Sequence, residues 1–247
     1  MLYSGPPTAP VPVPPRIAAL AGGRPLVPVW ENESGGLTFR IGEGEETLFA
    51  KWAAAGSGPD LAAEAERLVW AAPFTPVPRV LEHGSDADGS WLVTAGLPGE
   101  NAVSPRWRAD PGGAVRALGE GLRALHDQLP AAGCPFSWSV PDRVERARRE
   151  GVDVPDGLLQ PPPVERLVVC HGDACAPNTL LADDGSWSAH VDLGSLGLAD
   201  RWADLAVASA NTVGNYGPGW EDALLEAYGV TPDRQRLAYY RSLWRAT

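Results

Sequence analysis

The order of hydrophobic and polar positions divides the chain into a strand-rich first third and a mostly helical remainder. Residues 25–52 alternate between short apolar runs and glycine-bearing turns, which predicts antiparallel strands. Apolar residues then recur at helical spacing between Leu61 and Val69, which predicts a helix over 59–72. Two apolar runs around a polar Asp- and Gly-containing turn predict a hairpin over 78–99.

Helical periodicity dominates after residue 110. Apolar residues from Val115 to Leu129 lie on one face of an amphipathic helix predicted over 111–128. The remaining predicted elements are a strand at 166–170, a hairpin over 178–194, and helices at about 142–151, 200–212, 218–228 and 232–244.

This order predicts an α+β fold with two lobes and a ligand cleft between them. The β-rich N-lobe would span residues 17–95, and the mainly helical C-lobe residues 96–247. Residues 1–16 are rich in proline and are expected to form an extended tail.

Composition narrows the class of protein. No apolar run in the 247 residues is long enough to span a membrane, and the first sixteen residues do not resemble a signal peptide. Three cysteines favour reduced thiols in a cytoplasm over a disulfide framework. The net charge of −11 argues against a nucleic-acid partner and suits a cationic small molecule, although an acidic surface often serves solubility alone.

Lys51 is the only lysine among 20 basic residues, in a chain that otherwise uses arginine. Lysine offers a compact point charge on a slim stem, whereas a guanidinium is a wide planar fork. The retained lysine is therefore a candidate for a role that arginine cannot fill.

The segment 171–178 has the spacing His-x-Asp-x-x-x-x-Asn, and Asp192 follows fourteen residues after Asn178. Phosphoryl transfer needs a carboxylate at the acceptor hydroxyl, oxygen ligands for Mg²⁺ and a cation on the phosphates. Asp173 is the candidate base, and Asn178 and Asp192 are the candidate metal ligands. Lys51 would bind the phosphates of ATP, with Glu64 on the following helix as its partner.

Other interpretations of these residues exist. Asp and Asn commonly bend turns or cap helices, which is the preferred interpretation for Asp183 and Asp184. His171 and His190, each two residues before an aspartate, could instead hold the metal of a hydrolase. That alternative leaves Lys51 and Glu64 unexplained. We expect His171 to hold the loop by hydrogen bonds, and Asp204 to anchor its backbone.

The stretches around these residues resemble the aminoglycoside phosphotransferases of the 3′ and 3″ types, in order from about residue 31 to 243. The matching segments are ESGGLTFRI, LFAKW, DLAAEAERLVW, VVCHGDACAPNTLL and VDLGSLGLADRWADLAVA. The resemblance implies a protein-kinase-like fold and phosphorylation of an antibiotic hydroxyl, using ATP or GTP with Mg²⁺ and conferring resistance. It also implies that Ser34 and Gly35 lie over the phosphates. The connector at Thr94 and Ala95 would contact the adenine through its backbone.

The acceptor-binding part departs from the family pattern. Ser195 replaces an arginine, the segment before residue 167 is short, and the acidic terminus of the 3′ enzymes is missing. The missing acidic terminus favours a streptomycin-like 3″ acceptor over a 3′ one. The acidic residues expected to recruit a cationic acceptor are Glu145, Glu150, Asp153 and Asp156. The alternatives are a kinase of a capreomycin-type peptide or of a metabolite alcohol or amine, and a catalytically weak nucleotide-binding module.

Overall fold

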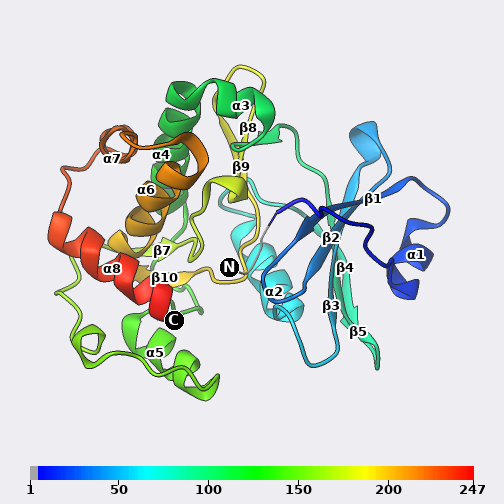
Figure 1. The fold of residues 1–247 in the computed structure, drawn as a ribbon, viewed down its shortest axis with the longest axis horizontal. Helices are drawn as coiled ribbons and strands as arrows, with labels where there is room; N and C mark the ends of the chain where they lie inside the picture. The colour runs from blue at the N-terminus through cyan, green and yellow to red at the C-terminus, as the bar shows by residue number, and fades with distance from the viewer. Residues whose placement is uncertain (1–4) are drawn as a thin grey trace. The chain divides into compact units, whose positions relative to one another are not determined.

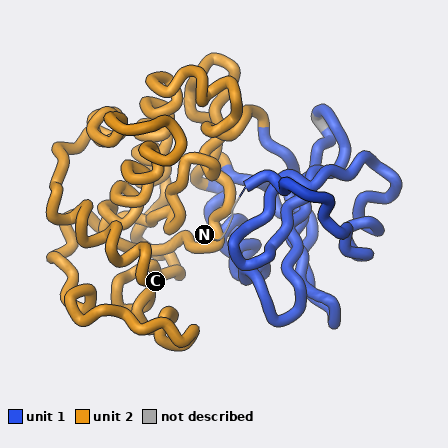
Figure 2. The backbone as a smooth tube through the Cα atoms, in the orientation of Figure 1, with its two compact units in different colours: residues 1–73, 77–97 blue, residues 74–76, 98–247 orange. Residues whose placement is uncertain are grey.

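A computed structural model of the chain describes residues 5–247, so residues 1–4 of the predicted tail lie outside the described residues. The chain forms two units, residues 1–73 with 77–97 and residues 74–76 with 98–247 (Figure 2). The assignment of a nucleotide-binding N-lobe and a substrate-binding C-lobe stays a prediction.

The first unit contains a five-stranded antiparallel sheet with the strand order β1-β2-β3-β5-β4 (Figure 1). Its strands are β1 (Leu26–Glu31), β2 (Leu37–Ile41), β3 (Leu48–Ala54), β4 (Val80–Ser85) and β5 (Gly89–Ala95). Its helices are α1 (Pro15–Ala21), α2 (Leu61–Ala71) and the 3₁₀ turn η1 (Gly44–Glu46).

Alternation along β3 gives the sheet two different faces. Ala50 and Trp52 point to a buried apolar cluster that also takes Ile17 and Ala21 of α1. Lys51 points to the opposite face, where α2 packs and where Glu64 lies. The strand period of two therefore separates the structural core from the candidate phosphate-binding lysine.

The second unit is mainly helical. Its helices are α3 (Pro105–Ala109), α4 (Pro111–Gln128), α5 (Val140–Arg149), α6 (Trp202–Tyr216), α7 (Glu221–Tyr228) and α8 (Arg234–Ala246), with 3₁₀ turns η2 (Asp156–Leu158) and η3 (Ala176–Asn178). Helix α4 packs against α7, and α6 contacts both α4 and α8 (Figure 1). Because α6 is buried over most of its length, it forms a rigid centre for this unit.

Two small sheets complete the second unit. A three-stranded sheet has the order β6-β8-β9, and a two-stranded sheet pairs β7 with β10. These strands are β6 (Glu100–Asn101), β7 (Leu167–Cys170), β8 (Thr179–Leu181), β9 (Trp187–His190) and β10 (Gly197–Asp200). Among the described helices, none is both long and apolar enough to cross a membrane.

The long helix α4, the short strand β7 and the β8–β9 hairpin agree with the sequence prediction, whereas β10 differs from it. Helix α4 covers the predicted residues 111–128. Strand β10 was not predicted, because its four residues include Gly and Asp and are stabilised by pairing with β7. It displaces the start of the helix expected at residue 200 to Trp202.

Candidate active site

Lys51 and Glu64 form an ion pair in the first unit. The Lys51 Nζ atom lies 2.7 Å from Oε1 and 2.8 Å from Oε2 of Glu64. Glu64 is only 3% exposed, so its carboxylate depends on a cation for its stability in this place. The structure thus brings together the two residues that sequence analysis paired.

The turn between β1 and β2 contains Ser34 and Gly35 and is organised by Asn32. Asn32 Oδ1 accepts hydrogen bonds from Ser34 N at 3.1 Å, Ser34 Oγ at 3.0 Å and Gly36 N at 2.6 Å. Gly35 has φ 81°, which favours glycine. Sequence reasoning missed Asn32, although Asn at the start of a Gly-Gly turn is a typical Asx-turn pattern.

The connector after β5 leaves few backbone donors for a base. Ala95 N donates to Arg79 O at 3.0 Å, and Gly96 N donates to Thr47 O at 2.8 Å. The Thr94 side chain is buried. The N–H groups of Ala95 and Gly96 are thus already paired, and the contact of the Thr94–Ala95 backbone with an adenine stays a prediction.

In the second unit, one turn brings Asp173 and Asn178 together. Asn178 Nδ2 donates to Asp173 O at 3.0 Å and to Asp173 Oδ2 at 3.1 Å. Asn178 N also donates to Cys175 O at 3.0 Å, within the 3₁₀ turn η3. The two candidate residues of the His-x-Asp-x-x-x-x-Asn segment are thus in direct contact.

The Asp173 carboxylate combines burial with an unused acceptor. Its Oδ1 atom is buried and has no hydrogen-bond partner among the described residues. Burial raises the pKa of Asp173, and the negative charge of Asp192 adds to that rise. A carboxylate with a raised pKa and a free oxygen is suited to accept a proton from a hydroxyl group.

Asp192 lies beside Asn178 because the two residues flank a paired hairpin. Thr179 of β8 is opposite His190 of β9, and Val191 N donates to Asn178 O at 2.9 Å. Asp192 has φ 65° and is the only non-glycine residue of the described chain with a positive φ. Such backbone strain is concentrated at functional sites in proteins.

These residues fit a magnesium ion. Because Asn178 Nδ2 is turned toward Asp173, the Asn178 Oδ1 atom remains for a cation. An amide oxygen and the Asp192 carboxylate are hard ligands, and Mg²⁺ commonly takes one or two carboxylates from a protein.

His171 and Asp204 hold the start of the loop, as the sequence predicts. Asp204 on α6 accepts from His171 N at 2.6 Å and from Gly172 N at 2.9 Å. His171 Nε2 lies 3.0 Å from Val191 O, and His171 Nδ1 accepts from Asp173 N at 3.3 Å. Both ring nitrogens are occupied, which argues against the alternative of a His-x-Asp hydrolase site.

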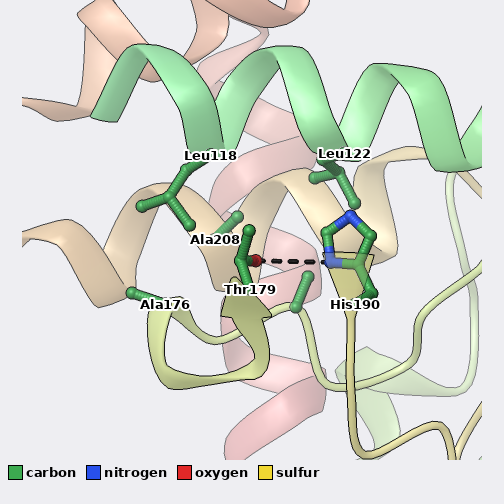
Figure 3. Close-up of a pocket in the computed structure, with 7 residues that line it drawn as sticks. Leu118, Leu122, Ala176, Thr179, His190 and Ala208 are labelled. Atoms are coloured by element: carbon green, nitrogen blue, oxygen red, sulfur yellow. Dashed lines mark hydrogen bonds between the residues drawn. The ribbon is translucent and has the colours of Figure 1, made fainter. Parts of the chain in front are cut away.

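A small cavity lies under the loop, between α4, α6 and the β8–β9 hairpin (Figure 3). Leu118, Leu122 and Ala208 line it together with Thr179 and His190. Thr179 Oγ1 lies 3.3 Å from His190 Nδ1. Its small size makes it part of the core and not a substrate pocket.

The predicted acceptor-binding residues are on the surface of the second unit. Glu145, Glu150, Asp153 and Asp156 are all exposed. Glu145 already has a cationic neighbour, since its Oε1 lies 3.1 Å from Arg149 Nε. No described contact joins these four residues to the Asp173 loop, so their role stays a prediction.

Comparison with known proteins gives consistent results. Residues 30–240 match the Phosphotransferase enzyme family. An aminoglycoside 3′-phosphotransferase of Streptomyces fradiae is 36% identical over 86% of this chain and 91% of its own length. A streptomycin 3″-kinase of Streptomyces griseus is 34% identical over 87% of this chain and 89% of its own. The structure of aminoglycoside phosphotransferase APH(3″)-Id from Streptomyces rimosus with ADP and streptomycin superposes with a TM-score of 0.66, at 30% identity over 84% of this chain and 88% of that chain.

Proposed function

The chain belongs to the aminoglycoside phosphotransferases of the Phosphotransferase enzyme family, and we propose on that premise that it transfers the γ-phosphoryl group of ATP to a hydroxyl of a cationic aminoglycoside antibiotic. The observation that carries this proposal is the unpartnered Oδ1 of Asp173 beside Asn178. The 3″ hydroxyl of a streptomycin-like acceptor and a 3′ hydroxyl are both candidate targets, because a streptomycin 3″-kinase and an aminoglycoside 3′-phosphotransferase are similar to this chain to nearly the same extent.

In this mechanism each protein group has one task. Asp173 Oδ1 accepts the hydrogen bond of the acceptor hydroxyl, and takes its proton as the new P–O bond forms. Lys51, held by Glu64, places a positive charge on the phosphates. The turn at Ser34 and Gly35 would lie over the phosphates, with its shape held by the backbone N–H groups of Ser34, Gly35 and Gly36 that donate to Asn32.

Asn178 Oδ1 and the Asp192 carboxylate would hold Mg²⁺, which neutralises charge on the transferred phosphoryl group when bound. GTP would present the same phosphates. The base would be bound at the connector, with Leu97 N as the first available donor beyond Ala95 and Gly96. Because the reaction consumes a nucleoside triphosphate, it would take place in the cytoplasm and would protect the cell from the antibiotic.

Phosphotransfer by the purified protein tests the proposal. Streptomycin, kanamycin, neomycin, hygromycin and capreomycin are offered with MgATP, and ADP release and acceptor phosphorylation are measured. We expect turnover of one aminoglycoside that falls about 10²–10⁴-fold in Asp173→Asn, the range for loss of a general base. Asp184→Asn is the matched control, since Asp184 is an exposed turn residue of the neighbouring hairpin.

Failure with all five compounds while ATP is still bound would contradict the antibiotic acceptor. Turnover of capreomycin alone would replace the aminoglycoside by a cationic peptide. Equal loss of activity in Asp173→Asn and Asp184→Asn would contradict the proposal that Asp173 is the general base.

A further inference from the structure

Helix α6 contacts the Asp173–Asn178 loop through two side chains on one face. Asp204 and Asn211 are seven residues apart, which is close to two full helical turns. Asp204 binds the backbone at the start of the loop. Asn211 Oδ1 accepts a hydrogen bond of 2.7 Å from Ala176 N, in the middle of the loop.

The contact at Ala176 replaces a missing helix cap. Ala176 is the first residue of the 3₁₀ turn η3, and the preceding Cys175 makes no capping hydrogen bond with its side chain. An uncapped N–H at the start of a helical turn needs a partner. The partner comes from α6, so Asn211 fixes the turn that ends at Asn178.

The orientation of the Asn211 side chain is itself determined. Asn215, one turn later, donates from Nδ2 to Asn211 Oδ1 at 2.8 Å and to Asn211 O at 3.0 Å. Arg108 of α3 donates to Asn215 Oδ1 at 3.3 Å. Because Asn211 Oδ1 receives two N–H groups, it must be the oxygen and not the nitrogen of the amide.

We propose that Asn211 is a positioning residue that sets the Asn178 side chain relative to Asp173, and through it the affinity for Mg²⁺. This inference rests on the proposed function, because it assumes that Asn178 is a metal ligand. Loss of the Ala176 contact would leave the turn held only at its Asn178 end, by the bonds of Asn178 to Asp173 and Val191, and would let its start move. Partners that orient a metal ligand contribute strongly to metal affinity.

The first test uses the full chain without metal. Hydrogen–deuterium exchange of the peptide covering 174–181 is compared in wild type, Asn211→Ala and Asn211→Asp. The aspartate keeps an oxygen that can accept from Ala176 N, so it should restore slow exchange that the alanine loses. Val213→Ala is the matched control, because Val213 is exposed on the same helix.

The second test measures ATP binding by calorimetry over a series of MgCl₂ concentrations. We expect Asn211→Ala to need about tenfold more Mg²⁺ for half-maximal ATP binding. Asn211→Asp and Val213→Ala should follow wild type. The apparent KM for the acceptor should not change in Asn211→Ala, whereas general unfolding would weaken every ligand alike.

The results separate this inference from the proposed function. If wild type binds ATP with Mg²⁺ and Asn211→Ala has the same Mg²⁺ requirement and exchange rate, the positioning role is wrong. The role is also wrong if aspartate fails to restore what alanine removes. If wild type binds no ATP at any Mg²⁺ concentration, the proposed function itself fails and the inference fails with it.

Discussion

Lys51 is the only lysine of an arginine-rich chain, and it forms an ion pair with the buried Glu64. Its Nζ atom lies almost equally far from both Glu64 oxygens, at 2.7 and 2.8 Å, as a point charge on a slim stem permits. A guanidinium would also bind the Glu64 carboxylate, but its positive charge would be spread over a wider planar group. A Lys51→Arg variant that loses activity while keeping the ion pair with Glu64 would support the role that the composition predicts for this lysine.

His190 should make the stability of the protein depend on pH. Burial, and then the neighbouring His171 ring, lower the pKa of His190 to about 3 from its ordinary 6.5. Below pH 6.5 the unfolded chain binds a proton that the folded chain does not. The free energy of unfolding should then fall by up to about 1.4 kcal/mol for each pH unit, which chemical denaturation from pH 7 to pH 4 measures.

The His190→Asn variant isolates this effect. Asparagine keeps a polar group near Thr179 but cannot titrate in this range, so the loss of stability below pH 6.5 should be smaller than in wild type. His83→Asn is the control, because it makes the same substitution at a histidine that is exposed in the first unit. If the free energy of unfolding fell equally with pH in wild type and in His190→Asn, His190 would not be the source of the pH dependence.

Spacing in the sequence predicted that Asp173, Asn178 and Asp192 lie close together, because a loop and a hairpin bring their segments together locally. It could not find Asn211 or Asn32. The partner of Asn211 is a backbone N–H 35 residues away, and hydrophobic periodicity carries no information on such long-range hydrogen bonds. Asn32 acts within its own turn, and there the missing signal was local turn chemistry.

At the scale of elements, the β1–β2 turn should control nucleotide affinity through Asn32. Asn32→Ala removes the acceptor for three hydrogen bonds, so the turn should lose its shape around Ser34 and Gly35. We expect the apparent KM for ATP to rise several-fold with a smaller change in kcat. The unfolding free energy should fall by about 1 kcal/mol. Steady-state kinetics and chemical denaturation measure the two effects.

The β4–β5 turn supplies a matched control for that prediction. Asp86 Oδ1 accepts from Asp88 N at 2.9 Å and Gly89 N at 3.1 Å, in a comparable turn on the other side of the sheet. Asp86→Ala should lower stability by a similar amount and leave the KM for ATP unchanged. An equal rise in the KM for ATP in both variants would show that general loosening of the sheet, and not the Asn32 turn, is responsible.

Elements were predictable where their own residues determine them. The periodic apolar face of α4 defines its bounds at Pro111 and Gln128. The short helix α1 and the strand β10 depend on contacts with distant partners. Ile17 of α1 is buried in the sheet core, and Gly197 of β10 pairs with Cys170 of β7. The four-residue strand β7 was predictable from its continuous apolar run, whereas the Gly-Leu-Ala-Asp segment of β10 carries no strand pattern of its own.

At the scale of the whole molecule, the dominant property is the net charge of −11. A negative potential raises the local concentration of a cationic acceptor, and salt screens this attraction over about 8–10 Å. The apparent KM for the aminoglycoside should therefore rise as the NaCl concentration is increased from about 50 to about 500 mM, while kcat changes little.

Two sets of charge-neutralising substitutions distinguish a general field from a local acceptor surface. The first set replaces the predicted acceptor-binding residues of the second unit, Glu145→Gln, Glu150→Gln, Asp153→Asn and Asp156→Asn. The second set removes the same number of exposed charges from the first unit, Glu43→Gln, Glu46→Gln, Glu66→Gln and Asp88→Asn.

Both sets make the net charge less negative by the same amount. If a long-range field attracted the acceptor, weakening that field would therefore raise the acceptor KM equally in both sets. We expect only the first set to raise the KM and to flatten its salt dependence, since short-range attraction decides binding at physiological salt. Wild-type kinetics in the first set would show that these four residues do not bind the acceptor.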